Sequence, residues 1–288
     1  MPVLFALLTA FSNALSVVMQ HVASIGDPEH SKGWNFVRYL LSNPLWLLGW
    51  VALAAAFVFQ ALALHNGAIS VVQPLLVTEL IFALVLRWLW LRQSIQAVTW
   101  WAAALTCVSL TLFLAMAEPS GGNVLPTSGA WTSATLSIGG TAALLALLGR
   151  RGSPTRRAAL LGASTSMLWA LVATYIKATT DTLTQFGVSG MFSHWPIYAL
   201  AIAGLAAEVL DQAALHVGPL SISQPFIVIV DPIVSIALSV WIFGETFTAH
   251  FARLALGSFA FAAMCIAVTV LARTAPATMD PSPRAGPA

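Results

Sequence analysis

The sequence predicts an all-α polytopic membrane protein, and three observations support that fold class. Of its 288 residues, 59% are hydrophobic and only 8% are charged, whereas a soluble domain has about 25% charged residues. Nine stretches are long and apolar enough to cross a bilayer, and a short motif occurs twice at a constant offset. This composition excludes a disordered chain and a disulfide scaffold. The net charge of +2 arises from few residues, so no nucleic-acid partner is expected.

The nine stretches are expected to be helices, because a segment in lipid must satisfy its backbone hydrogen bonds internally. A helix needs about 20 apolar residues to cross about 30 Å of hydrocarbon. Tryptophans such as Trp46 and Trp50 lie at the ends of several stretches, as is typical of side chains at headgroup depth. The predicted spans are 2–25, 44–64, 69–91, 97–117, 128–149, 157–177, 196–216, 220–243 and 250–272.

The basic residues predict the orientation in the membrane. Ten of the twelve Lys and Arg residues fall after spans one, three and five or near the C-terminus, and only Lys177 and Arg253 fall on the opposite side. Because basic loops stay in the cytoplasm, the N-terminus is expected outside and the C-terminus inside. The ten Arg against two Lys favour a bacterial source. A multi-pass protein of the bacterial inner (plasma) membrane is therefore expected, with the lipid bilayer as its partner.

The repeated motif divides the chain into two halves. Residues 63–74 (ALHNGAISVVQP) and 214–225 (ALHVGPLSISQP) share seven identities at an offset of 151. The motif joins spans two and three in one copy and spans seven and eight in the other, so the copies cross the membrane in opposite directions. Inverted repeats are typical of secondary transporters, although a structural duplication is the alternative. The predicted domains are a first four-span repeat (1–117), a linker with an extra central span (118–152), a second four-span repeat (153–272) and a disordered tail (273–288).

Two acids lie in the middle of predicted spans. A charge at that depth costs about 2.5–3.5 kcal/mol on insertion scales, so such residues are usually functional. Glu79 lies in the third span and Asp231 in the eighth, 152 residues apart. Pro232 follows Asp231, provides no N–H group and disfavours helix at the residue before it. An interrupted helix beside Asp231 is therefore expected, an arrangement that holds cations in transporters.

Other polar residues are expected to line a hydrated cavity with these acids. Glu208 and Asp211 lie three residues apart on one face of the seventh span. The alternative is that each acid is neutral or paired, with Lys177, Arg87 or a histidine as its partner. No fixed metal site is expected, but a transported cation would bind at Glu79 and Asp231. The candidate substrate- or ion-binding residues are Glu79, Asp231, Glu208, Asp211, Gln60, Gln73, Gln224 and Asn13.

His65 and His216 close the second and seventh spans. Imidazole titrates near neutral pH, so a gating role is open to them, but capping or packing is the favoured interpretation. Gly244-Glu245, after the eighth span, is interpreted as a helix-end device rather than a ligand. The chain contains none of the common hydrolase, nucleotide-binding or metal-binding motifs. No catalytic residue, enzymatic activity or cofactor is expected.

The order of elements resembles a known family. A first span is followed by a semi-polar helical pattern at 31–46, a helix pair joined by a small-residue turn and a Gln-Pro step, an extra central helix, and the unit again. This order is similar to that of the EamA-like drug/metabolite transporter superfamily. The nine-span layout looks most like the NIPA-type magnesium transporter branch. That branch usually has an acid in its second span, whereas residues 54–64 contain none.

Three functions follow from these patterns. The first is a secondary transporter that works by alternating access on Mg²⁺ or another divalent cation. The second is a proton-coupled exporter of a small organic metabolite or drug, with Glu79 or Asp231 as the protonation site. The third is a non-transporting membrane scaffold. The glycine pair Gly139-Gly140 in the central span is compatible with packing inside one chain or in a homo-oligomer.

Overall fold

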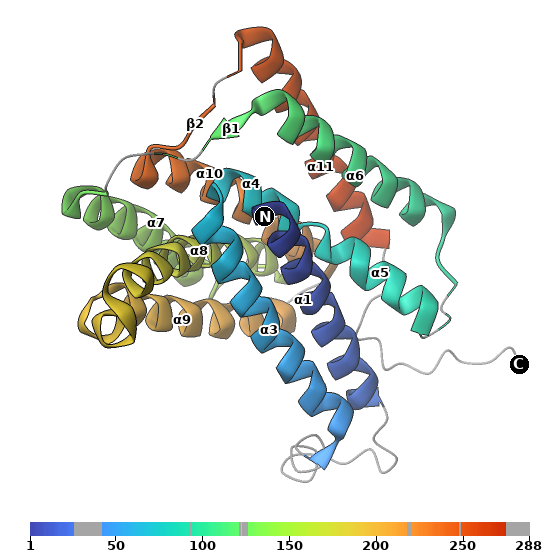
Figure 1. The fold of residues 1–288 in the computed structure, drawn as a ribbon. Helices are drawn as coiled ribbons and strands as arrows, with labels where there is room; N and C mark the ends of the chain where they lie inside the picture. The colour runs from blue at the N-terminus through green and yellow to red at the C-terminus, as the bar shows by residue number, and fades with distance from the viewer. Residues whose placement is uncertain are drawn as a thin grey trace, which may run out of the picture.

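The structure, a computed structural model, describes residues 1–25, 42–90, 92, 94–120, 122, 126–217, 220–247 and 249–274. Nearly all of these residues are helical (Figure 1). The elements are α1 (Pro2–Ile25), α3 (Pro44–Asn66), α4 (Ile69–Leu76), α5 (Glu79–Trp90), α6 (Ala97–Ala117), β1 (Pro119–Ser120), α7 (Ser128–Leu148), α8 (Pro154–Ser193), α9 (Pro196–Val217), α10 (Leu220–Phe243), β2 (Thr246–Phe247) and α11 (Phe251–Thr274).

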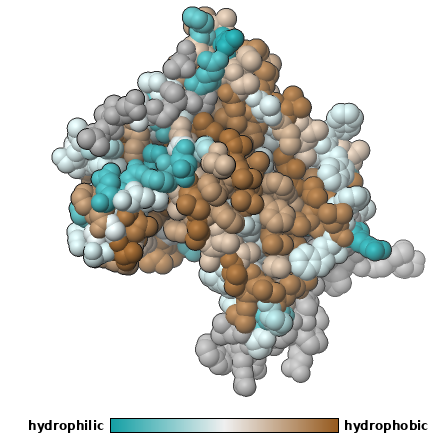
Figure 2. All heavy atoms as spheres, viewed as in Figure 1, coloured by the Kyte–Doolittle hydropathy of each residue, from teal (hydrophilic) through white to brown (hydrophobic). Residues whose placement is uncertain are grey.

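The exposed surface of these helices is largely apolar. Large hydrophobic side chains are exposed on α9 and α11, for example Leu205 and Phe259, each 71% exposed. Figure 2 shows hydrophobic residues over most of the visible face. Within the described residues, eight segments are long and apolar enough to span a membrane, with α4 and α5 counted together as one. The chain is therefore an all-α, multi-pass membrane protein.

Each of the nine predicted spans is occupied by a helix, with two differences in detail. The third predicted span is divided into α4 and α5 by a turn at Val77 and Thr78. The sixth continues to Ser193 instead of ending at residue 177, with one non-helical residue, Gly187 (φ 71°). Hydropathy did not predict this extension because it is rich in threonine. Three of its four threonine hydroxyls, those of Thr180, Thr182 and Thr184, donate to carbonyls of the preceding turn, as Thr180 does to Ile176 at 2.8 Å.

The helices pair in the same way in the two parts of the chain. In the first part, α1 packs against α3, α4 and α5; in the second, α8 packs against α9 and α10. The fourth helices of the two parts, α6 and α11, pack against each other (Figure 1). The central helix α7 packs mainly on α8. A two-residue antiparallel pair, β1 with β2, joins the connections that follow α6 and α10.

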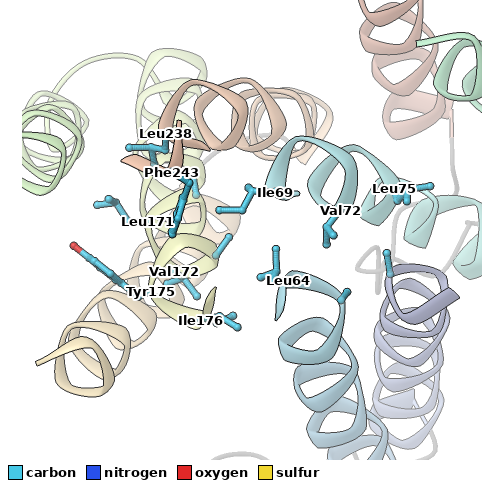
Figure 3. Close-up of a cluster of buried hydrophobic side chains, with 14 of the residues drawn as sticks. Leu64, Ile69, Val72, Leu75, Leu171, Val172, Tyr175, Ile176, Leu238 and Phe243 are labelled. Carbon is cyan, nitrogen blue, oxygen red and sulfur yellow. The ribbon is translucent and has the colours of Figure 1, made fainter. Parts of the chain in front are cut away.

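The main hydrophobic core lies where these two parts meet. The end of α3 and the start of α4 contribute Leu64, Ile69 and Val72, which are fully buried. Buried side chains of α8 and α10, such as Ile176 and Leu238, belong to the same cluster (Figure 3). The connection between α3 and α4 is thus packed against the second part of the chain. This packing brings the first copy of the repeated motif, residues 63–74, next to α8 and α10.

Candidate functional site

The first feature of the candidate site is the break between α4 and α5. Pro74 has no N–H group, so one backbone hydrogen bond of α4 is missing. The backbone then makes two hydrogen bonds between residues three positions apart, as in a 3₁₀ turn. They run from Val77 N–H to the Pro74 carbonyl (3.3 Å) and from Thr78 N–H to the Leu75 carbonyl (3.0 Å). The Thr78 hydroxyl donates to the same Leu75 carbonyl at 2.6 Å. Glu79 is the first residue of α5, directly after this turn.

The Glu79 carboxylate is bound by a side chain from another helix. Asn13 of α1 donates from Nδ2 to Glu79 Oε2 at 3.2 Å, and both residues are half-buried. The partner of Glu79 in the described structure is therefore an amide. Neither Lys177 nor Arg87, the basic partners that the alternative interpretation offered, makes an ion pair with Glu79 within the described residues. This amide satisfies part of the hydrogen-bonding capacity of Glu79 without neutralising its charge.

Asp231 has a different setting from the one predicted. The predicted helix interruption at Asp231 is wrong, because α10 is continuous from Leu220 to Phe243. Ser235, one turn later, donates from Oγ to Asp231 Oδ1 at 3.0 Å. This hydrogen bond lies within α10. The helix tolerates Pro232 because neighbouring groups can compensate for the backbone hydrogen bond that a proline removes. Within the described residues, Asp231 and Glu79 make no hydrogen bond to each other.

A serine of α8 holds the segment of α10 that precedes Asp231. Ser166 is fully buried. Its Oγ lies 3.1 Å from the Phe226 carbonyl and 3.0 Å from the Ile227 carbonyl. The hydroxyl therefore joins the small, polar face of α8 to α10, one turn before the acid. This cross-helix contact was not predicted.

Gln73 lies close in sequence to the break between α4 and α5. It is a buried polar residue with one unsatisfied atom in the described part of the chain. Its side chain is 2% exposed. In the described part of the chain, its Oε1 atom has no hydrogen-bond donor. Buried amide oxygens almost always have a partner, and one without a partner can accept a hydrogen bond or coordinate a hard cation. Gln73 was predicted as a binding residue, and its orphan oxygen is consistent with that role.

The other predicted residues lie apart from this arrangement or outside the described set. Glu208 is exposed on α9, Asp211 is half-buried one turn later, and Gln60 is half-buried in α3. His65 ends α3 and is exposed, with Nδ1 3.2 Å from Asp181 Oδ1. The side chains of His216 and Gln224 lie outside the described residues.

Glu245 makes three hydrogen bonds between the two parts of the chain. It is 2% exposed. Its Oε1 accepts from Ile69 N–H at 2.7 Å, and its Oε2 accepts from Ser70 N–H (3.0 Å) and the Ser70 hydroxyl (2.7 Å). A carboxylate here satisfies free N–H groups and interacts well with the positive end of the α4 dipole. The predicted helix-end role of Glu245 is confirmed, but the helix is α4 rather than its own.

Lys177 binds the same connection from α8. Its Nζ donates to the Leu64 carbonyl at 2.6 Å and the Gly67 carbonyl at 3.0 Å. His65, Lys177, Asp181 and Glu245 thus form a group of charged and polar residues at one end of the bundle, which we call the end cluster. A cavity of about 370 Å³ lies beside it, lined in part by Pro2, Asn66 and Phe243.

A close backbone approach beside the end cluster requires glycine at position 122. A Cβ atom at Gly122 would lie 1.8 Å from the Phe243 carbonyl oxygen. We therefore expect Gly122→Ala to lower the free energy of unfolding by about 1–3 kcal/mol, measured as a lower thermal midpoint in detergent. Gly140→Ala is the matched control, because a Cβ there meets nothing within 4 Å. Equal midpoints for the two variants would refute the close approach.

The comparisons with known proteins give one uncharacterized relative. The chain is 29% identical over 276 residues to an uncharacterized protein of Corynebacterium glutamicum, covering 94% of each chain. No protein-family model matches the chain. No solved structure matches it either.

Proposed function

We propose that this chain is a secondary transporter that works by alternating access on a divalent cation, with Mg²⁺ the first candidate. The observation behind this proposal is the broken helix α4–α5 with Glu79 at the break. Broken helices inside membranes provide polar backbone ends at the binding sites of transporters. Mg²⁺ and Ca²⁺ prefer oxygen ligands, and the break offers the Glu79 carboxylate. The unpartnered Gln73 amide oxygen lies in the half-helix before it.

The two parts of the chain are proposed to be inverted repeats. Their helices pair in the same order, α1 with α3 and α8 with α9. The two copies of the ALH…QP motif lie at corresponding positions in the two parts. An odd number of spans between the copies would give them opposite directions. In this proposal α7 is the extra central span, and the chain belongs to the drug/metabolite transporter superfamily. Rocking of the two repeats would expose Glu79 and Asp231 to each side in turn.

The end cluster supports this mechanism because it lies at one end of the bundle, where its hydrogen bonds join the two parts of the chain. Lys177 lies about 35 Å along α8 from Pro154, given a rise of about 1.5 Å per residue. The basic residues around the start of α8 and the end cluster therefore lie about one membrane thickness apart along α8. If basic loops are cytoplasmic, the end cluster is external, with the N-terminus outside. We propose that the structure is closed on that side of the plasma membrane.

The experiment that tests the function is Mg²⁺ flux into proteoliposomes. Purified protein is reconstituted with a trapped Mg²⁺ indicator, and lipid-only vesicles serve as the control. The proposal expects uptake well above this control, driven by an inward Mg²⁺ gradient. No uptake by protein shown to be folded would reject the magnesium substrate. A scaffold role predicts no flux of any solute.

A second candidate, proton-coupled export of an organic solute, is supported by an aromatic cluster. Trp131 lies 5.8, 5.1 and 5.7 Å from the rings of Tyr175, Trp195 and Phe243, measured between centroids. Such faces bind flat or cationic organic molecules. The same vesicles, loaded with a pH-sensitive dye, test this candidate. Solute-driven proton movement in the absence of Mg²⁺ uptake would favour export over cation transport.

A further inference from the structure

A second cavity lies near the start of α8, about 35 Å along that helix from Lys177 of the end cluster, given a rise of about 1.5 Å per residue. It has a volume of about 330 Å³ and lies where α7, α8 and α9 meet. Its apolar lining includes Ala146, Leu147, Leu161 and Leu210. Arg150 of the loop between α7 and α8 and Arg157 of the first turn of α8 also line it. Because α7 and α8 both span the membrane, this loop lies at the membrane surface.

The two arginines give the cavity a positive rim. Arg157 donates from Nε to the Gly149 carbonyl at 3.2 Å, which fixes the guanidinium and leaves its Nη groups available. The sequence contains no acid between Glu118 and Asp181. On α9, Leu210 and Ala213 line the cavity, but the neighbouring acids of that helix do not. The cavity therefore combines guanidinium groups with apolar walls.

The apolar walls are continuous with the lipid-facing surface. Leu144 and Leu147 of α7 are each 55% exposed, and Leu147 also lines the cavity. An acyl chain can therefore lie along α7 and enter the cavity without crossing a polar surface. A small soluble anion would leave these walls uncovered. The combination fits a molecule with a charged head and an apolar tail.

We propose that this cavity binds an anionic phospholipid, with its phosphate at Arg150 and Arg157 and one acyl chain against Leu147 and Leu210. Arginine forms two parallel hydrogen bonds to a phosphate group. Basic pockets between membrane helices recognise anionic headgroups in the same way. A phospholipid without net charge satisfies only the apolar half of the site. The inference concerns a different end of the molecule from the proposed transport site and does not depend on it.

The test is lipid binding to the full chain in detergent, measured by native mass spectrometry with phosphatidylglycerol. The variant Arg150→Gln/Arg157→Gln is compared with Arg151→Gln/Arg156→Gln. The second pair removes the same charge from the neighbouring positions but does not line the cavity. We expect the first variant to lose affinity by about 25-fold, or about fivefold for each arginine. The second variant is expected to stay within about threefold of the wild type, because Arg151 and Arg156 are exposed and water and salt screen exposed charges.

Three further arms make the result decisive. Ala146→Phe keeps all four arginines but fills the cavity, and it is expected to lower phosphatidylglycerol binding. Glycerol phosphate and phosphatidylcholine should each bind much more weakly than phosphatidylglycerol. Equal losses for the two arginine pairs would overturn the proposal in favour of general attraction by the loop. Tight binding of glycerol phosphate would assign a soluble phosphate instead, and an unaffected Ala146→Phe would remove the acyl chain from the cavity.

Discussion

Replacing Glu79 by glutamine is expected to reduce Mg²⁺ flux by about a hundredfold without unfolding the protein. The amide oxygen of glutamine can still accept the hydrogen bond that Asn13 donates to Glu79, so packing is preserved. The charge that would bind the cation is lost, and removing one partner of a buried charge pair costs about 2–5 kcal/mol. Flux into proteoliposomes measures this effect, with the thermal midpoint as a check on folding.

Glu118→Gln is the matched control for this experiment. It makes the same chemical change, but Glu118 is exposed after the end of α6 and is not a candidate binding residue, so the flux of this variant should equal that of the wild type. Flux retained by Glu79→Gln would mean that the break at Val77 and Thr78 does not bind the cation. Equal losses for Glu79 and Glu118 would instead indicate a general effect of surface charge.

Asp231→Asn separates the two acids predicted at mid-span. The asparagine can still accept a hydrogen bond from Ser235, so this variant should also fold. A loss equal to that of Glu79→Gln is expected if the two repeats bind one cation between them. Normal flux for Asp231→Asn would limit the site to the first repeat.

The largest expected effect on stability is that of Glu245→Ala. This change leaves two backbone N–H groups and the Ser70 hydroxyl without their acceptor in a buried position. Each unsatisfied buried group costs about 1–3 kcal/mol, so we expect a loss of about 3–5 kcal/mol in the free energy of unfolding. The measurement is the thermal or denaturant midpoint in detergent.

Glu118→Ala provides the comparison for Glu245→Ala. Glu118 also forms an ion pair, with Arg253, but both side chains are exposed. Exposed pairs contribute about 0–1 kcal/mol, so the midpoint should change little. If Glu118→Ala were as destabilising as Glu245→Ala, burial would not be the reason for the effect. Glu245→Gln should fall between them, because it retains one acceptor oxygen.

Most of the fold was predictable because lipid makes local composition decisive. Each predicted span contains a helix, since twenty apolar residues in a bilayer have few other solutions. The ends of helices were less predictable. Hydropathy ended the sixth span at residue 177, whereas threonine hydroxyls allow α8 to continue to Ser193. The helix break was expected at Pro232 but occurs after Pro74, because a proline bends a helix only where the surrounding packing permits it.

The partners of the candidate residues were not predictable from spacing. Asn13 and Glu79 were both expected to line a cavity, but their hydrogen bond joins residues 66 positions apart. The alternative interpretation offered Glu79 a basic partner, since opposite charges are a common way to bury an acid, whereas its partner in the structure is the Asn13 amide. Glu245 could be assigned to a helix end from its position after a glycine. That it caps the N-terminus of α4 depends on the packing of the two parts of the chain.

The contact between Glu245 and Ile69 spans 176 residues of the chain, which has a consequence for biosynthesis. Ribosomes add about 5–20 residues per second, so the start of α4 waits roughly 10–35 s for its acceptor. During that time the first part of the nascent chain inserts with backbone N–H groups whose acceptor, Glu245, follows α10. Early insertion must therefore rely on the translocon, on water at the membrane surface or on a transient protein partner. Chains that stop before residue 245 should be recognised by membrane quality-control proteases, even though every helix of their first part has already been made.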